Sequence, residues 1–136
     1  MDTVDNFNST VKKLVILLYD NATKEEKKEG IERYKGMIFT ALHIDPLIGV
    51  RRIGPYLLEN KELIYSGDFL SMKVEELNGY IESRYKSDYE GKKIEELLDI
   101  ARKMYARFEN EKRETILKSV QTMLDIYVKY LYESST

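Results

Sequence analysis

The chain has 136 residues, of which 43% are hydrophobic and 34% are charged. This composition provides both a core and a solvated surface, and it excludes a disordered chain. The 22 basic and 24 acidic residues give a net charge of −2. That balance argues against a dedicated nucleic-acid binder, which usually carries a basic excess, but leaves the alternative open. The absence of cysteine excludes disulfides, thiolate metal sites and cysteine nucleophiles.

The beginning of the sequence and its longest apolar run bear on location. Met1 to Asp5 lacks the basic opening of a signal peptide, and the apolar run from Leu14 to Tyr19 is far shorter than the roughly 20 residues that span a bilayer. We therefore expect no membrane span and no secretion. The expected location is intracellular, in the cytoplasm or in a virion, and the expected organisation is a single helical domain over 1–136.

Apolar residues recur three and four positions apart through most of the chain, which predicts an all-α fold, a compact bundle of five to six helices. The first predicted helix runs from Ser9, as its N-cap, to Tyr19. Thr23 and Glu26 match a capping box, which predicts the start of a second helix. The charged opening of that helix, 24–29, is expected to lie in water. Its apolar stripe consists of Ile31, Tyr34, Ile38, Ala41 and Leu42.

Prolines divide the middle of the chain. The Asp45–Pro46 pair is typical of a helix start, because aspartate can cap and proline supplies the φ angle of the first turn. The Gly54–Pro55 pair breaks the helix again, so 46–60 is predicted to form two short helical pieces. Residues 64–69 are predicted to be an ordered connection that includes a few extended residues.

The sequence of the second half of the chain predicts three more helices. The first covers 73–85. Ser87 and Glu90 form a further possible capping box, which opens a strongly amphipathic helix that ends near Asn110. The last and longest helix covers 111–132. Because the turn between these last two helices is very short, they are predicted to form a C-terminal antiparallel helical hairpin.

The sequence contains no recognisable catalytic motif. His43 is the single histidine, with Asp45 two positions on, and neither Glu-x-x-His nor His-x-x-x-His spacing occurs. Adjacent acidic pairs point about 100° apart on a helix and do not act together. Glycine patterns that cradle phosphates or carry a nucleophilic serine are absent. We predict no catalytic, cofactor-binding or metal residue, and no enzyme. The alternative is an unfamiliar helical site where His43 meets carboxylates from distant helices.

Tyrosine is abundant, with eleven copies and no tryptophan. Tyrosine suits protein interfaces because it combines a large contact area with a hydroxyl that tolerates water, although it also borders cores. Tyr127, Tyr130 and Tyr132 cannot all turn toward one core from a single helix. They form the candidate protein interface, either with a partner or with a second copy.

Arg51 and Arg52 differ from the other basic pairs because no acidic residue lies between Asp45 and Glu59. Together with Tyr56 they form a candidate contact with an anionic surface. This local basic patch supports an alternative function, that of a nucleic-acid-associated helical module.

From Ile44 to Leu131, about two thirds of the chain, the order of features resembles small helical proteins of unassigned role encoded by large nucleocytoplasmic DNA viruses. The features are Asp45–Pro46, Pro55–Tyr56, Ile64 with Asp68–Phe69–Leu70, and the helical pair over 94–131. The first two helices lie outside the resemblance. It implies a viral setting, a minor structural or virion component, and no catalytic residues. The favoured function is therefore a non-enzymatic protein-interaction or assembly protein.

Overall fold

The computed structural model describes residues 2–67, 104–105 and 107–135. These residues form helices and no strand, which confirms the all-α prediction for the described part of the chain. The predicted helix over 73–85 and most of the helix after Ser87 lie outside the described residues, and so does the predicted C-terminal hairpin. The described elements are α1 (Asp2–Asp20), α2 (Lys24–Glu26), the π-helical segment η1 (Lys27–Ile31), α3 (Glu32–Ile44), α4 (Ile48–Arg52), α5 (Gly54–Glu59), α6 (Lys61–Ser66) and α9 (Asn110–Ser134).

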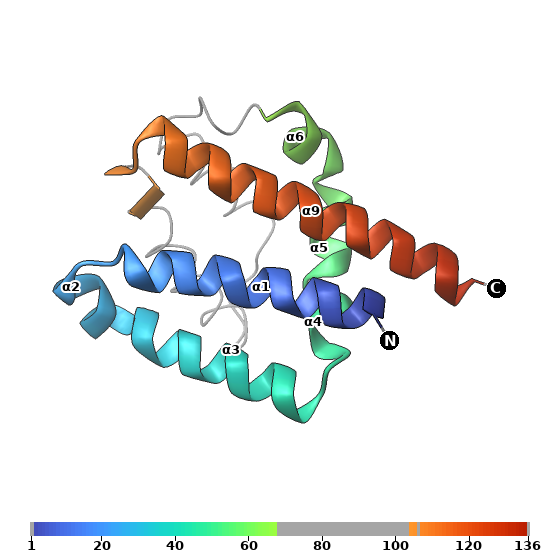
Figure 1. Ribbon diagram of the computed structural model, residues 1–136, viewed down its shortest axis with the longest axis horizontal. Helices are drawn as coiled ribbons and strands as arrows, with labels where there is room; N and C mark the ends of the chain where they lie inside the picture. The colour runs from blue at the N-terminus through green and yellow to red at the C-terminus, as the bar shows by residue number, and fades with distance from the viewer. Residues whose placement is uncertain (1, 68–103, 106, 136) are drawn as a thin grey trace.

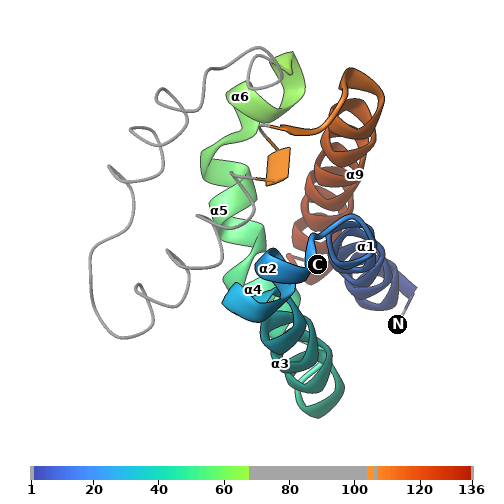
Figure 2. The same cartoon turned by 90° about the vertical axis from the view of Figure 1, so that its left-hand side faces the viewer.

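The helices form two layers. α3, α1 and α9 lie side by side in one layer, and the column of α4, α5 and α6 crosses them as the second (Figures 1 and 2). α9 packs mainly against α1, and the two run antiparallel. The hydroxyl of Thr3, at the start of α1, donates to Glu133 near the end of α9 at 2.5 Å. At the other end, Arg107, just before α9, donates to the carbonyl of Asn21, just after α1.

The main core lies between these layers, with Phe7 of α1 and Leu124 of α9 fully buried at its centre. Its buried members are Phe7, Val11, Leu42, Val50, Leu57, Ile64, Met123, Leu124 and Tyr127. Val4 and Phe7 continue the apolar spacing of α1 toward its beginning, and both are buried. The helix therefore starts at Asp2, and the predicted N-cap at Ser9 is wrong because Ser9 lies exposed within α1.

The capping box that opens the second helix is confirmed. The Thr23 hydroxyl accepts from the backbone of Glu26 at 3.1 Å, and the Glu26 carboxylate accepts from the backbone of Thr23 at 2.8 Å. Gly30, at φ 149°, then kinks the chain within η1, a backbone angle that favours glycine. The predicted stripe is correct at Ile31, Tyr34 and Leu42, which are buried. The expectation of a wholly solvated opening is wrong, because Glu26 is only 8% exposed.

The middle of the chain forms three short helices. Asp45 accepts from the backbone of Leu47 at 3.2 Å, and α4 begins at Ile48, two residues later than predicted. The break before Pro55 is confirmed, since α4 and α5 are separate helices. The extended connection predicted over 64–69 is wrong for 64–66, which belong to α6.

Contacts with α9 explain why this segment is helical. Ile64 is buried in the main core, and its carbonyl accepts from the Gln121 side chain at 3.0 Å. The Tyr65 hydroxyl donates to Asp125 at 2.7 Å. This hydrogen bond, together with partial burial and the charge of Asp125, raises the pKa of Tyr65 to about 12. Ile64 and Tyr65, in one helical turn of α6, therefore both make a hydrogen bond to α9.

Gly54 allows a close approach between the two layers. A Cβ atom at this position would lie 2.2 to 2.7 Å from three ring atoms of Tyr127. Both residues are buried, and the Tyr127 ring also stacks on Tyr130, with 6.2 Å between ring centres. The glycine therefore has a packing role.

We expect Gly54→Ala to destabilise the protein by about 1 to 3 kcal/mol, because an added methyl group in a filled core forces side chains and backbone apart. Urea denaturation followed by circular dichroism measures the change. Gly36→Ala is the matched control. Gly36 is exposed within α3, and a Cβ atom there would meet nothing within 4 Å, so alanine is expected to stabilise by up to about 1 kcal/mol. Equal effects of the two substitutions would contradict the packing role of Gly54.

Candidate functional site

The three tyrosines of the candidate interface occupy different environments. Tyr127 is 7% exposed and belongs to the main core, whereas Tyr132 is 74% exposed. Tyr130 is half-buried and packs against the edge of that core. The expectation that one of the three would be exposed is confirmed at Tyr132. The core uses Tyr127, so only Tyr130 and Tyr132 can contribute to a surface.

The C-terminal end of α9 projects beyond the other described helices (Figure 1). Beside it, an open groove of about 550 Å³ is lined by Thr3, Val4, Leu47, Lys129, Tyr130, Glu133 and Ser134. The groove thus lies between the start of α1 and the end of α9, next to the turn that precedes α4. Leu131 and Tyr132, at the same end of α9, are exposed apolar side chains that do not line the groove. We call this projecting end, Lys129 to Ser134, the α9 end surface.

The candidate anion contact is placed on α4 and α5. Arg51 and Arg52 are exposed in the last turn of α4, and Tyr56 lies half-buried in α5. Arg52 and Tyr56 already take part in other interactions. The structure therefore leaves Arg51 as the more available cation of this patch.

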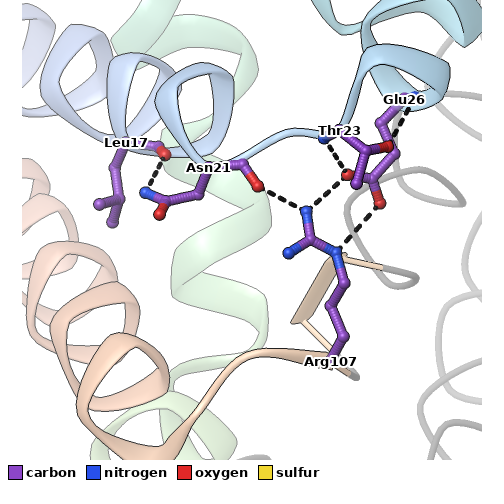
Figure 3. Close-up of polar contacts among 5 residues, drawn as sticks. All are labelled: Leu17, Asn21, Thr23, Glu26 and Arg107. Atoms are coloured by element: carbon purple, nitrogen blue, oxygen red, sulfur yellow. Dashed lines mark hydrogen bonds and ion pairs between the residues drawn. The ribbon is translucent and has the colours of Figure 1, made fainter.

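A polar cluster centres on Arg107 and Glu26 (Figure 3). One terminal nitrogen of Arg107 donates to Glu26 at 2.6 Å and to the Asn21 carbonyl at 2.5 Å, and its Nε donates to the other Glu26 oxygen at 3.4 Å. Glu26 also caps α2 through Thr23. The cluster therefore fastens the residues before α9 to the turn between α1 and α2, and its polar groups face one another.

The protonation of Glu26 follows from this cluster. Burial alone would raise the pKa of Glu26, but the hydrogen bonds from Arg107 and Thr23, with the charge of Arg107, leave that pKa below its ordinary value. A lowered pKa means that the folded state stabilises the ionised form of the Glu26 carboxylate. These contacts support a structural role.

A second cationic feature was not predicted from the sequence. The Lys27 and Lys35 ammonium groups lie 4.5 and 4.3 Å from the centre of the Tyr19 ring. Lys35 also lies 5.8 Å from the centre of the Phe39 ring, as does Lys12. These residues come from α1, η1 and α3. The sequence spacing predicts the contact between Lys35 and Phe39, which are four residues apart on α3. The contacts of Lys12 with Phe39 and of Lys35 with Tyr19 depend on the packing of α1 against α3.

The described residues do not assemble the histidine site that the enzyme alternative requires. His43 is exposed in the last turn of α3. Over the described ranges there is no group of three histidine, cysteine, aspartate or glutamate side chains that could hold a metal ion. In the same ranges, none of the helices combines the length and the apolar composition needed to cross a bilayer.

A double-mutant cycle tests the Arg107 and Glu26 pair. We expect Glu26→Gln and Arg107→Met to couple by about 1 kcal/mol at pH 7, the upper end for exposed pairs, because Arg107 is 39% exposed and solvent screens it. Since the pKa of Glu26 is lowered in the fold, the stabilisation is present above its ordinary value of 4.5. It is lost as the pH falls through the lowered value. Urea denaturation at pH 7 and at a series of pH values below 4.5 measures the coupling energy and its loss.

The control for this cycle is Glu111→Gln combined with Arg107→Met, since Glu111 is an exposed carboxylate in the first turn of α9. That pair should couple weakly at every pH. Coupling of Glu26 with Arg107 that does not decrease anywhere as the pH is lowered below 4.5 would be incompatible with an ionic contact.

Comparisons with known proteins identify no relative. No protein-family model matches the chain, and neither a curated protein nor a solved structure does so. The functional argument therefore rests on the residues themselves.

Proposed function

We propose that the chain is a non-enzymatic assembly protein that pairs with a second copy of itself through the α9 end surface. The observation that carries this proposal is the projection of α9 beyond the other described helices with Tyr132 74% exposed on it. Large exposed aromatic side chains are concentrated at protein contacts, where burial of the ring is favourable and the hydroxyl still finds a partner. The viral setting implied by the sequence resemblance fits such a role and is part of the proposal.

The charges of the α9 end surface favour a second copy as the partner. Lys129 and Glu133 are four residues apart and share one face of the helix, and both are exposed. When two such ends pair antiparallel about a two-fold axis at position 131, Lys129 of each copy faces Glu133 of the other. Tyr130 and Tyr132 point about 160° apart around the helix, so they flank this charged face on opposite sides. The surface is complementary to itself in charge.

The size of this surface predicts a weak contact. A stable interface buries about 800 Å² on each partner, and a projecting helix end with its groove provides less. We therefore expect dissociation in the micromolar range. A contact of this strength suits assembly, because several weak contacts add up when copies are held together.

Sedimentation velocity over about 1 to 300 μM protein tests the pairing. We expect the wild-type chain to shift from monomer to dimer, and Tyr132→Ser to move this transition to at least about tenfold higher concentration because the central ring is lost. Lys129→Glu should abolish dimerisation, since two like charges then face each other. The swapped variant, Lys129→Glu with Glu133→Lys, should restore it.

Lys118→Glu is the matched control. Lys118 is exposed on α9 but lies outside the end surface, so this charge reversal should leave dimerisation unchanged. A chain that stays monomeric at every concentration, and that purifies from its native source without a partner, would refute the proposal. Dimerisation that the swapped variant fails to restore would exclude this antiparallel pairing.

A further inference from the structure

Three lysines and two aromatic rings form a continuous row across α1, η1 and α3. Lys12 lies beside Phe39, Lys35 lies between Phe39 and Tyr19, and Lys27 lies on the far side of Lys35 beside Tyr19. All five side chains are half-buried, so each exposes part of its surface. We call these residues, Lys12, Phe39, Lys35, Tyr19 and Lys27, the lysine row.

The lysine row concentrates positive charge. Over the ranges 2–67, 104–105 and 107–135, its three ammonium groups contact aromatic rings and make no ion pair. Glu26, the buried carboxylate nearby in sequence, is paired with Arg107. Two ammonium groups within 4.5 Å of one ring centre repel each other. An anion bound between them would relieve this repulsion.

The row continues into a second basic feature. Lys27 also lines an open hollow of about 360 Å³ together with Lys28, Gly30, Glu32 and Arg33. Lys28 of η1 and Arg33 of α3 therefore add positive charge next to Lys27, and Glu32 also lines the hollow. The arrangement is elongated, which suits a chain of anionic groups better than one compact ion.

We propose that the lysine row binds the phosphodiester backbone of a single-stranded nucleic acid. A row of cations is one means by which proteins follow a single strand, because the cations contact successive phosphates. The aromatic rings hold the lysines in place through cation–π contacts, so less side-chain freedom is lost on binding. This inference does not rest on the proposed dimerisation. The net charge of −2 weakens the binding, and the phosphate contacts make it salt-dependent.

Fluorescence anisotropy with a labelled oligothymidylate of about 15 nucleotides tests the proposal at low salt. For three phosphate contacts, we expect the logarithm of the binding constant to fall with the logarithm of salt concentration with a slope of about −2. Lys27→Glu with Lys35→Glu should weaken binding at least about tenfold and flatten this slope. If circular dichroism shows that this variant is unfolded, Lys27→Gln with Lys35→Gln tests the same contacts.

Two pair variants with the same change in net charge serve as controls. Lys61→Glu with Lys118→Glu alters exposed lysines on α6 and α9, and Arg51→Glu with Arg52→Glu alters the patch on α4. Neither should weaken binding more than about threefold. Equal losses in all three variants, a selective loss in the Arg51 and Arg52 variant, or no binding at low salt would each overturn the proposal. So would binding to phosphatidylserine vesicles without binding to the oligonucleotide.

Discussion

The antiparallel contact between α1 and α9 is the interaction on which the rest of the described structure depends. It joins 19 residues near one end of the chain to 25 residues near the other, so it closes the fold over a long separation in sequence. Helices of five or six residues, such as α4, α5 and α6, do not persist alone in water, because nucleation costs more than so few hydrogen bonds return. They form because the surface made by α1 and α9 buries their apolar side chains. The Tyr127 ring of α9 packs directly against Gly54 of α5, where no side chain intervenes.

The two ends of this helix pair differ in a way that matters for function. At one end, Arg107 and Glu26 satisfy each other, and the chain around them is tied down. At the other end, an exposed hydrogen bond from Thr3 to Glu133 joins the helices, and α9 continues past its neighbours with Tyr132 in water. At the first end, the polar groups of Arg107 and Glu26 pair with each other. At the second end, the apolar side chains of Leu131 and Tyr132 are exposed. This asymmetry locates the proposed assembly contact at the α9 end surface.

Local rules in the sequence predicted the features that depend on neighbouring residues. The capping box of Thr23 and the break before Pro55 follow from side-chain hydrogen bonding and from the missing donor of proline, and both are present. Features that depend on tertiary contact were missed. Residues 64–66 are helical because Ile64 and Tyr65 meet α9, and no spacing in the sequence indicates that contact. The lysine row likewise needs α1 beside α3, since spacing places Lys12 and Tyr19 on one helix but not opposite Lys35.

Electron paramagnetic resonance distances between paired spin labels test the antiparallel contact directly. The chain has no cysteine, so labels can be attached at engineered cysteines alone, either at Asp5 with Lys129 or at Asp5 with Glu111, all of which are exposed. With 1.5 Å of rise per residue along α9 and about 10 Å between packed helix axes, the antiparallel arrangement predicts that the distance from Asp5 to Glu111 exceeds that from Asp5 to Lys129 by roughly 20 Å. Similar distances, or the reverse order, would contradict the fold on which both proposed surfaces rest.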